Sequence, residues 1–329
     1  MRDDDLLGWA TGPLAELDEL APGLLRRTCT AAPLTRQAIF MALARWERSE
    51  RPGSTTNAAQ LLRDGRAGDI IKGLFGVLPE GLLGALERLG PQWLCSRESY
   101  GRLWTIYTDK DRRAAKALQY VGPISDRTLR VIDVLNAKLL HPEVLKRIDT
   151  RSQAVDFNRA INLLEAASSR VTDAALSEAF ARMQSPTAIP RMLHRLLRTC
   201  DRFPPHPCTG DAELRPLQTA RDLIEAARQF RNCLSSKIGD AVVGRVAFAE
   251  FRGVSAKAIC EFLPLSNGAG WFLSEVHVGR NERVPHDVRA AAEQKCASFG
   301  IPHIAVPEDA DWRSLRRIIR GNDIFSLAA

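Results

Sequence analysis

The spacing of apolar residues changes partway along this 329-residue chain, and that change constrains the fold more than any other feature of the sequence. Up to about residue 240, apolar residues recur at three- and four-residue steps, the period of an amphipathic helix. Beyond it, three runs rich in β-branched and aromatic residues alternate with a period of two, which is typical of strands. The chain is therefore predicted to be an α+β protein.

The region before residue 200 is predicted to be helical almost throughout, with breakers such as Pro52-Gly53 and Gly122-Pro123 between the helices. The expected helices span 34–48, 58–63, 70–75, 81–89, 100–120, 127–140, 154–167, 174–183 and 191–200. They show no repeated fingerprint at a fixed period. A helical bundle or an irregular helical stack is expected, which would serve as a scaffold and offer a surface to protein partners.

Composition changes sharply after residue 200, because three prolines and a glycine fall within 204–210. Such a segment is typical of a domain boundary. The predicted organisation is a helical domain at 1–200, a proline-rich linker at 201–214 and a smaller α+β domain at 215–329.

The smaller domain is predicted to contain a three- or four-stranded antiparallel meander flanked by helices. An amphipathic helix starts at Leu217 and ends near Arg231 and Asn232. Asn267-Gly268 predicts a hairpin, because both positions tolerate positive φ. The remaining expected elements are strands at 242–251, 256–263 and 271–278, a helix at 285–298, a short strand at 301–306 and a last helix at 312–320.

Side chains alternate between the two faces of a strand, so the pattern also predicts which residues face the core. The predicted core residues of the last two long strands are Ala258, Cys260, Phe262, Phe272, Val276 and Val278. The opposite face then carries Glu261, Glu275 and His277, followed at the strand end by Arg280 and Asn281. These polar side chains are the candidate site.

One chemistry for this site uses Cys233 as a nucleophile, with His277 as the base and Glu275 or Asn281 as the orienting group. The predicted position of Cys233 at a helix C-terminus disfavours a reactive thiolate, since the helix dipole there raises the pKa of a thiol. A buried structural thiol is the favoured interpretation.

A second chemistry uses Glu261, Glu275 and His277 as ligands for a divalent metal, as in a nuclease, with Lys257 on the face of Glu261. Charged residues are also expected on any solvent-exposed sheet face. The sequence therefore assigns no metal site and identifies no cofactor.

The chain is basic, with 46 Lys and Arg residues against 39 Asp and Glu residues and a net charge of +7. This balance favours association with phosphate backbones or acidic partners. Two predicted helices carry arginines at helical spacing on one face. The predicted nucleic-acid contacts are Arg191, Arg195, Arg198, Arg231, Asn232, Arg280, Arg313, Arg316, Arg317 and Arg320. A solvated basic face without a partner is the alternative for each helix.

No apolar run approaches the roughly 18 residues needed to cross a membrane, and the acidic start at 1–5 lacks the basic region of a signal peptide. A cytoplasmic location without a membrane partner is expected.

Seven cysteines without a C-x-x-C pair disfavour a disulfide framework. Cys200, His206 and Cys208 cluster in sequence, but structural zinc needs about four ligands at short spacings.

The order of several short motifs resembles the PcfJ-like domain of conjugative plasmids and other mobile elements. These motifs are Arg231-Asn232-Cys233, Gly244 ahead of the first strand, Glu261 in the middle strand, and Gly279-Arg280-Asn281 ahead of a helix. The resemblance is confined to the C-terminal part of the chain. It implies a nucleic-acid-transfer setting in which members act as accessory proteins near the relaxase complex, and it implies no reaction.

Two functional hypotheses follow. The first is a non-enzymatic nucleic-acid-associated accessory protein that binds backbone phosphates through basic faces and protein partners through its helical region. The second is an enzyme acting on nucleic acid, either nuclease-like or cysteine-dependent, through the face of Cys233, Glu261, Glu275, His277 and Asn281. A cleft in which these side chains converge would support the enzyme, and a flat salt-bridged surface would support the binding protein.

Overall fold

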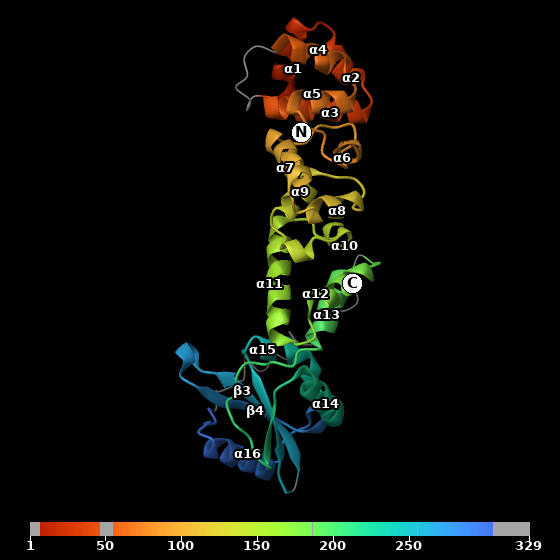
Figure 1. Ribbon diagram of the computed structural model, residues 1–329. Coiled ribbons are helices and arrows are strands. Elements are labelled where there is room, and N and C mark those ends of the chain that lie inside the picture. Colours follow the sequence, from red (N-terminus) through yellow and green to blue (C-terminus); the bar gives the residue numbers. More distant parts are fainter. Residues whose placement is uncertain (1–6, 47–54, 186, 255, 305–329) are drawn as a thin grey trace. The chain divides into compact units, whose positions relative to one another are not determined.

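The structure is a computed structural model that describes residues 7–46, 55–185, 187–254 and 256–304 (Figure 1). The chain forms two compact units. The first consists of Met1–Asn162 and Thr172–Met192, and the second of Leu163–Val171 and Leu193–Ala329. Among the described residues, no helix combines the length and the apolar character needed to cross a membrane. The division into independently folding domains at the proline-rich segment 201–214 stays a prediction.

The first unit is helical. Its elements in chain order are η1 (Gly8–Ala10), α1 (Thr11–Leu20), α2 (Leu24–Thr30), α3 (Pro33–Trp46), α4 (Thr55–Asp64), α5 (Ala67–Phe75), α6 (Leu82–Arg88), α7 (Arg97–Thr108), α8 (Arg113–Gln119), α9 (Asp126–Ile132), η2 (Ala137–Leu139), α10 (Pro142–Leu145), most of α11 (Arg151–Ala167), α12 (Asp173–Ala181) and the start of α13 (Ala188–Leu197). Helix α3 packs against α5, α6 and α7. Its residues 38–44 are all buried, as expected of a helix that is surrounded by other helices.

The single helix predicted at 100–120 is wrong, because α7 ends at Thr108 and α8 begins at Arg113. Between them, the carboxylate of Asp109 accepts a hydrogen bond of 2.9 Å from the backbone N–H of Asp111. A short polar side chain that bonds to the backbone two residues later offers a turn in place of a helix. The helix predicted at 127–140 likewise divides into α9 and η2.

The second unit contains a four-stranded antiparallel sheet in the order β1-β2-β3-β4, so the predicted α+β class with an antiparallel meander is confirmed. The strands are β1 (Leu214–Leu217), β2 (Ala247–Arg252), β3 (Lys257–Pro264) and β4 (Trp271–His277). Helix α14 (Ala220–Phe230), η3 (Leu234–Lys237) and α15 (Ile238–Val242) connect β1 to β2. The hairpin between β3 and β4 contains η4 (Ser266–Gly268), with the expected positive φ at Asn267 and Gly268.

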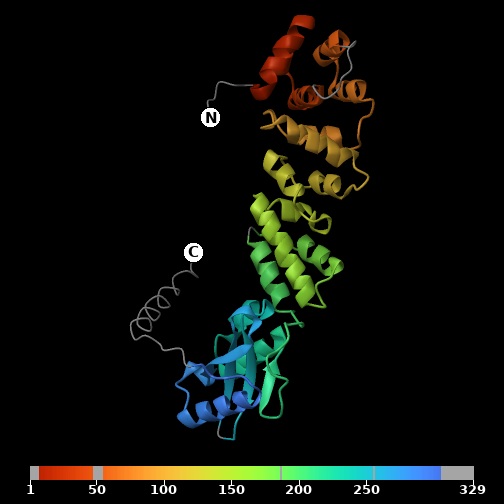
Figure 2. The same ribbon diagram turned by 90° about the vertical axis from the view of Figure 1, so that its left-hand side faces the viewer.

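After β4 the chain passes through η5 (Gly279–Asn281) into α16 (His286–Ser298), which packs against β3 and β4 (Figure 2). Apolar residues between the sheet and α16 form one buried cluster. From the strands it contains Leu214, Ala249, Phe251, Ala258, Cys260, Phe262, Leu273 and Val276, and from α16 it contains Val288, Ala292 and Cys296. One face of the sheet is therefore committed to packing.

The predicted core face of β3 is confirmed, whereas that of β4 is partly wrong. The register shifts between Glu261 and Phe262, so that Glu261 pairs with Glu275 and Phe262 pairs with Leu273. Ser274 is the extra residue of this β-bulge, and the faces before it are reversed. Leu273 is consequently buried in the cluster in place of Phe272.

Several predicted boundaries also need correction. The first long strand begins at Ala247 and not at Val242, because residues 238–242 form α15. Residues 214–217 form a strand that the sequence did not predict. The strand predicted at 301–306 is present as a single parallel bridge between Leu273 and His303. The helix predicted at 312–320 lies outside the described residues.

Candidate functional site

The sheet face opposite α16 carries charged side chains that are drawn from all four strands. At its centre, the buried carboxylate of Glu250 lies 3.2 Å from Arg215 Nε and 2.9 Å from Arg252 Nη2. Burial acts to raise the pKa of Glu250, but hydrogen bonds from Arg252 and Arg215 outweigh it and hold that pKa below its usual value. Lys257 lies at 3.8 Å from the same carboxylate. This ion network ties β1, β2 and β3 together.

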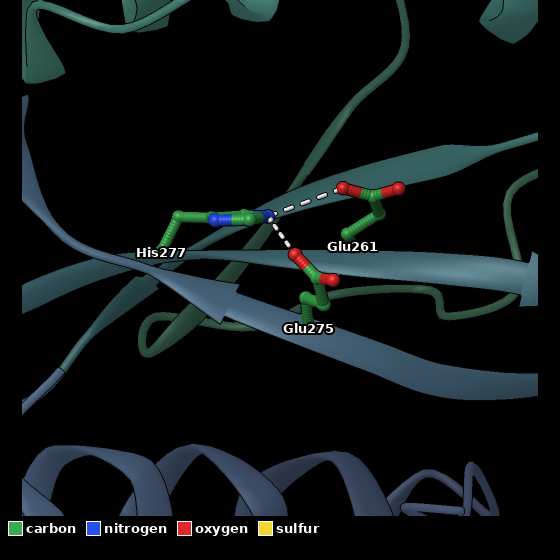
Figure 3. A group of neighbouring side chains, drawn as sticks. All are labelled: Glu261, Glu275 and His277. Carbon is green, nitrogen blue, oxygen red and sulfur yellow. Dashed lines mark hydrogen bonds and ion pairs between the residues drawn. The ribbon is translucent and has the colours of Figure 1, made fainter. Parts of the chain in front are cut away.

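Next to this network, Glu261, Glu275 and His277 converge, and we call them the acid–histidine group (Figure 3). The His277 Nε2–H donates to Glu261 Oε2 over 3.1 Å and lies 3.5 Å from Glu275 Oε2. One ligand atom from each residue lies within 4.8 Å of the others. The bulge at Ser274 makes this possible, because Glu275 and His277 then share the face of Glu261.

The acid–histidine group is partly open to solvent. The exposed fractions of the side chains are 18% for Glu261, 28% for His277 and 47% for Glu275. A solute or ion can therefore reach the group, while the strands hold its three members in place.

Beyond His277 lies an open groove of about 520 Å³, at the end of the sheet where β3 begins and β4 ends. We call it the basic groove, since its charged lining consists of Arg231, Lys257, Arg280, Arg283 and Glu282. The C-terminal end of α14 forms one wall and η5 forms another. A Cβ atom at Gly279 would lie 3.7 Å from the Phe230 carbonyl oxygen, which shows how closely these two walls approach.

The cations of the basic groove are mostly unneutralised. Arg231, Arg280 and Arg283 are exposed, and none of them has an ion-pair or hydrogen-bond partner for its side chain among the described residues. Lys257 has only the 3.8 Å contact with Glu250. Four cationic side chains against the one carboxylate of Glu282 leave the groove with a formal charge of +3.

Two residues of the basic groove hold an unfavourable backbone conformation. Among the described residues, the non-glycine residues with positive φ are Arg231 at 49°, Asn267 at 58° and Arg280 at 57°. This left-handed conformation costs a residue with a Cβ about 1–2 kcal/mol of conformational free energy. At the end of a helix it is usually adopted by glycine. Such outliers concentrate at functional sites. Arg231 ends α14 in the place of that glycine.

The predicted burial of Cys233 is wrong, since its side chain is exposed. Helix α14 ends at Phe230, and the left-handed Arg231 turns the chain away before Cys233 is reached. Cys233 instead precedes η3. Among the described residues, the side chains of His, Cys, Asp and Glu that converge are those of the acid–histidine group, and Cys233 is not one of them. The sequence hypothesis of a Cys233 nucleophile with His277 as its base gains no support.

The remaining predicted contacts are placed as follows. The Asn232 side chain accepts a hydrogen bond of 3.2 Å from the backbone N–H of Leu234 and so has a local structural role. Arg191 and Arg195 are exposed on α13, and the exposed Arg198 follows directly after it. Asn281 contributes its backbone to η5, and its side chain lies outside the description, as do Arg313, Arg316, Arg317 and Arg320.

Sequence reasoning missed Arg283 and Glu282 altogether, and it placed Lys257 beside Glu261 without linking it to Arg231 or Arg280. The available signal was the density of charge directly after Gly279, because all four residues at 280–283 are polar or charged. The structure adds what the sequence could not show, which is that the end of α14 lies against this segment.

Cys200, His206 and Cys208 do not converge as a ligand set in the described structure. The His206 Nε2–H donates to the Phe248 carbonyl over 2.8 Å, and Nδ1 accepts from the Cys208 N–H over 3.2 Å. Burial lowers the pKa of His206, so the ring is neutral and both nitrogens are used in packing the segment before β1 against β2. The cavity beside His206 measures about 10 Å³, which is room for about one water molecule.

Comparison of the chain with known proteins found no family model that matches it, no similar curated protein and no similar solved structure.

Proposed function

We propose that the second unit binds the phosphate backbone of a nucleic acid through the basic groove. The observation that carries the proposal is the set of three arginines, Arg231, Arg280 and Arg283, that gather in one open groove and have no side-chain partner in the described part of the chain. Like charges held together without counterions raise the free energy of the folded chain, and a bound polyanion removes that cost. Guanidinium groups also match phosphate oxygens with two parallel hydrogen bonds.

The lining of the groove favours contact with the backbone over recognition of bases. Its aromatic residue, Phe230, is only 4% exposed and offers no face on which a base could stack. Contacts with phosphates fix position without reading sequence. Binding is therefore expected to depend strongly on salt and weakly on nucleotide sequence.

Within this proposal the protein is a cytoplasmic accessory protein of a mobile-element or DNA-transfer system. The charge of the groove supports the nucleic-acid part, and the resemblance to PcfJ-like domains supports the setting. Candidate additional contacts are Arg191, Arg195, Arg198 and the arginines at 313–320. The helices of the first unit are the candidate surface for protein partners.

The test is the salt dependence of binding to labelled single-stranded and duplex DNA. Replacing Arg231, Arg280 and Arg283 with glutamine should weaken binding at each salt concentration. Each lost phosphate contact should reduce the slope of log K against log salt by about 0.9 on duplex DNA and about 0.7 on single strands. The matched control is Arg221→Gln, an exposed arginine of α14 that is paired with Glu225. A slope in the triple variant equal to that of the control would reject the groove as the contact.

The second candidate function, an enzyme acting on nucleic acid, is favoured by one observation, the convergence of Glu261, Glu275 and His277. If it is correct, the purified chain should cleave labelled DNA or RNA in the presence of Mn²⁺, and Glu275→Gln should abolish cleavage without changing binding. Cleavage that persists in the variant would point to a contaminant or another site.

A further inference from the structure

We propose that Glu261, Glu275 and His277 bind a divalent transition-metal ion, with Mn²⁺ and Zn²⁺ as the fitting ions. This site is separate from the proposed backbone binding, because it uses none of the groove cations and needs no nucleic acid to form.

The two distances from His277 to the glutamates match those between ligands of one metal ion. Metal–nitrogen and metal–oxygen bonds of about 2.1 Å place neighbouring donors about 3.0 Å apart in an octahedral site and about 3.4 Å apart in a tetrahedral one. His277 Nε2 lies 3.1 Å and 3.5 Å from the two carboxylate oxygens. The three donor atoms, all within 4.8 Å of one another, therefore need only small side-chain rotations to close on an ion.

The donor types narrow the identity of the ion. Carboxylates suit Mn²⁺ and imidazole suits Zn²⁺, whereas Mg²⁺ and Ca²⁺ prefer sites made of oxygen alone. Three protein ligands also leave coordination positions for water, as in sites whose metal remains reachable from solvent. The 47% exposure of Glu275 leaves that open side.

The position of the two glutamates gives an electrostatic reason for a cation. Glu261 and Glu275 are directly paired across β3 and β4. Like charges at directly opposed positions destabilise a sheet. A divalent ion bound between the two carboxylates would reduce this repulsion.

Such an ion would also lie close to the basic groove. His277 and Arg280 are three residues apart at the end of β4, and Lys257 and Glu261 share one face of β3. The acid–histidine group, which would bind a cation, and the basic groove, which would bind an anion, would then be neighbours along β3 and β4.

The experiment titrates Mn²⁺ alone into the untagged full chain, without nucleic acid, and follows free Mn²⁺ by electron paramagnetic resonance. Mn²⁺ is the primary probe, because the exposed thiols of Cys29, Cys95 and Cys233 can bind Zn²⁺ and bind Mn²⁺ poorly. One Mn²⁺ per chain is expected, with a rise in melting temperature that grows with Mn²⁺ concentration.

Glu275→Gln keeps the shape of a half-exposed side chain and should raise the Kd for Mn²⁺ by more than about tenfold, since even residues behind the ligands change metal affinity by that factor. Glu293→Gln is the matched control, because Glu293 lies 3.4 Å from His303 in a pair with a single carboxylate. The control should bind Mn²⁺ as the parent does.

Circular dichroism of each variant checks that it is folded. His277→Gln should weaken Zn²⁺ binding more than Mn²⁺ binding if the imidazole is a ligand. Absence of stoichiometric Mn²⁺ binding, or equal binding by the parent and a folded Glu275→Gln, would overturn the proposal and leave a metal-free ion pair between His277 and the two glutamates. Because the titration contains no nucleic acid, its failure leaves the proposed backbone binding intact.

Discussion

The buried carboxylate of Glu250 allows a quantitative test of how the sheet is held together. Glu250→Gln keeps the size of the side chain but removes the charge that faces Arg215 and Arg252. Hydrogen bonds to charged groups contribute about 1.5–3 kcal/mol each when buried. The two arginines are 38% and 43% exposed, so screening by solvent reduces each contribution toward about 1 kcal/mol. The expected loss is about 2 kcal/mol of unfolding free energy.

This loss should depend on pH in a defined direction. The pKa of Glu250 is lowered in the folded chain, so its ionised form is preferred there more strongly than in the unfolded chain. The carboxylate therefore contributes its full stabilisation above its unfolded-state pKa of about 4.3. The contribution is lost as the pH falls through the lower, folded-state pKa. The difference in unfolding free energy between the parent and Glu250→Gln should be constant from pH 7 to about pH 5.5 and should decrease below about pH 4.3.

Urea unfolding followed by circular dichroism, repeated at several pH values, measures both quantities. Glu225→Gln is the control, because Glu225 is half-exposed and pairs with Arg221 along one helix, where such pairs contribute about 0.3–0.5 kcal/mol. The reasoning would be refuted if Glu250→Gln lost no more unfolding free energy than the control, or if the difference from the parent did not change with pH. Ionised Glu250 would then not be the group that holds β1, β2 and β3 together.

Three further changes are expected to separate structural from functional roles. Cys233→Ser should leave the unfolding free energy within about 0.5 kcal/mol of the parent by scanning calorimetry, since the thiol is exposed. Arg231→Gly should raise stability by about 1 kcal/mol in urea unfolding while weakening DNA binding, because glycine relieves the positive φ of 49°. Gly210→Ala should lower the melting temperature, because φ is +81° and the new Cβ would lie 2.3 Å from Pro216 Cδ.

The sequence predicted those elements whose local pattern and tertiary environment agree. The alternation of β3 and the Asn267-Gly268 turn belong to this set, and both were confirmed. β1 was missed, because Pro216 interrupts a short run and proline argues against a strand. Proline is tolerated at the edge of a sheet, and β1 is one of the two edge strands of this sheet. That position depends on pairing with β2, which lies some thirty residues later and is not encoded locally.

The candidate site was predicted in part for similar reasons. Strand alternation alone placed Glu261, Glu275 and His277 on one face, although the bulge at Ser274, which changes the face of Phe272, left no signal in the sequence. Cys233 was misplaced, since the apolar stripe of the preceding helix continues to Leu234 while the helix itself ends at Phe230. The residue that ends it is an arginine in a conformation typical of glycine, which composition cannot reveal.

The position of the basic groove beside a helix C-terminus raises the question of whether its cations merely complement the dipole of α14. A helix C-terminus carries about half of a negative elementary charge, and cations near it are stabilised by about 0.3–1 kcal/mol at exposed sites. Arg231 can meet that need alone, although its left-handed backbone conformation costs about 1–2 kcal/mol, which is more than this gain. The groove holds a formal charge of +3, several times the partial charge of the helix end. The dipole therefore accounts for one arginine at most, and the excess charge of Lys257, Arg280 and Arg283 is what an anionic ligand would neutralise.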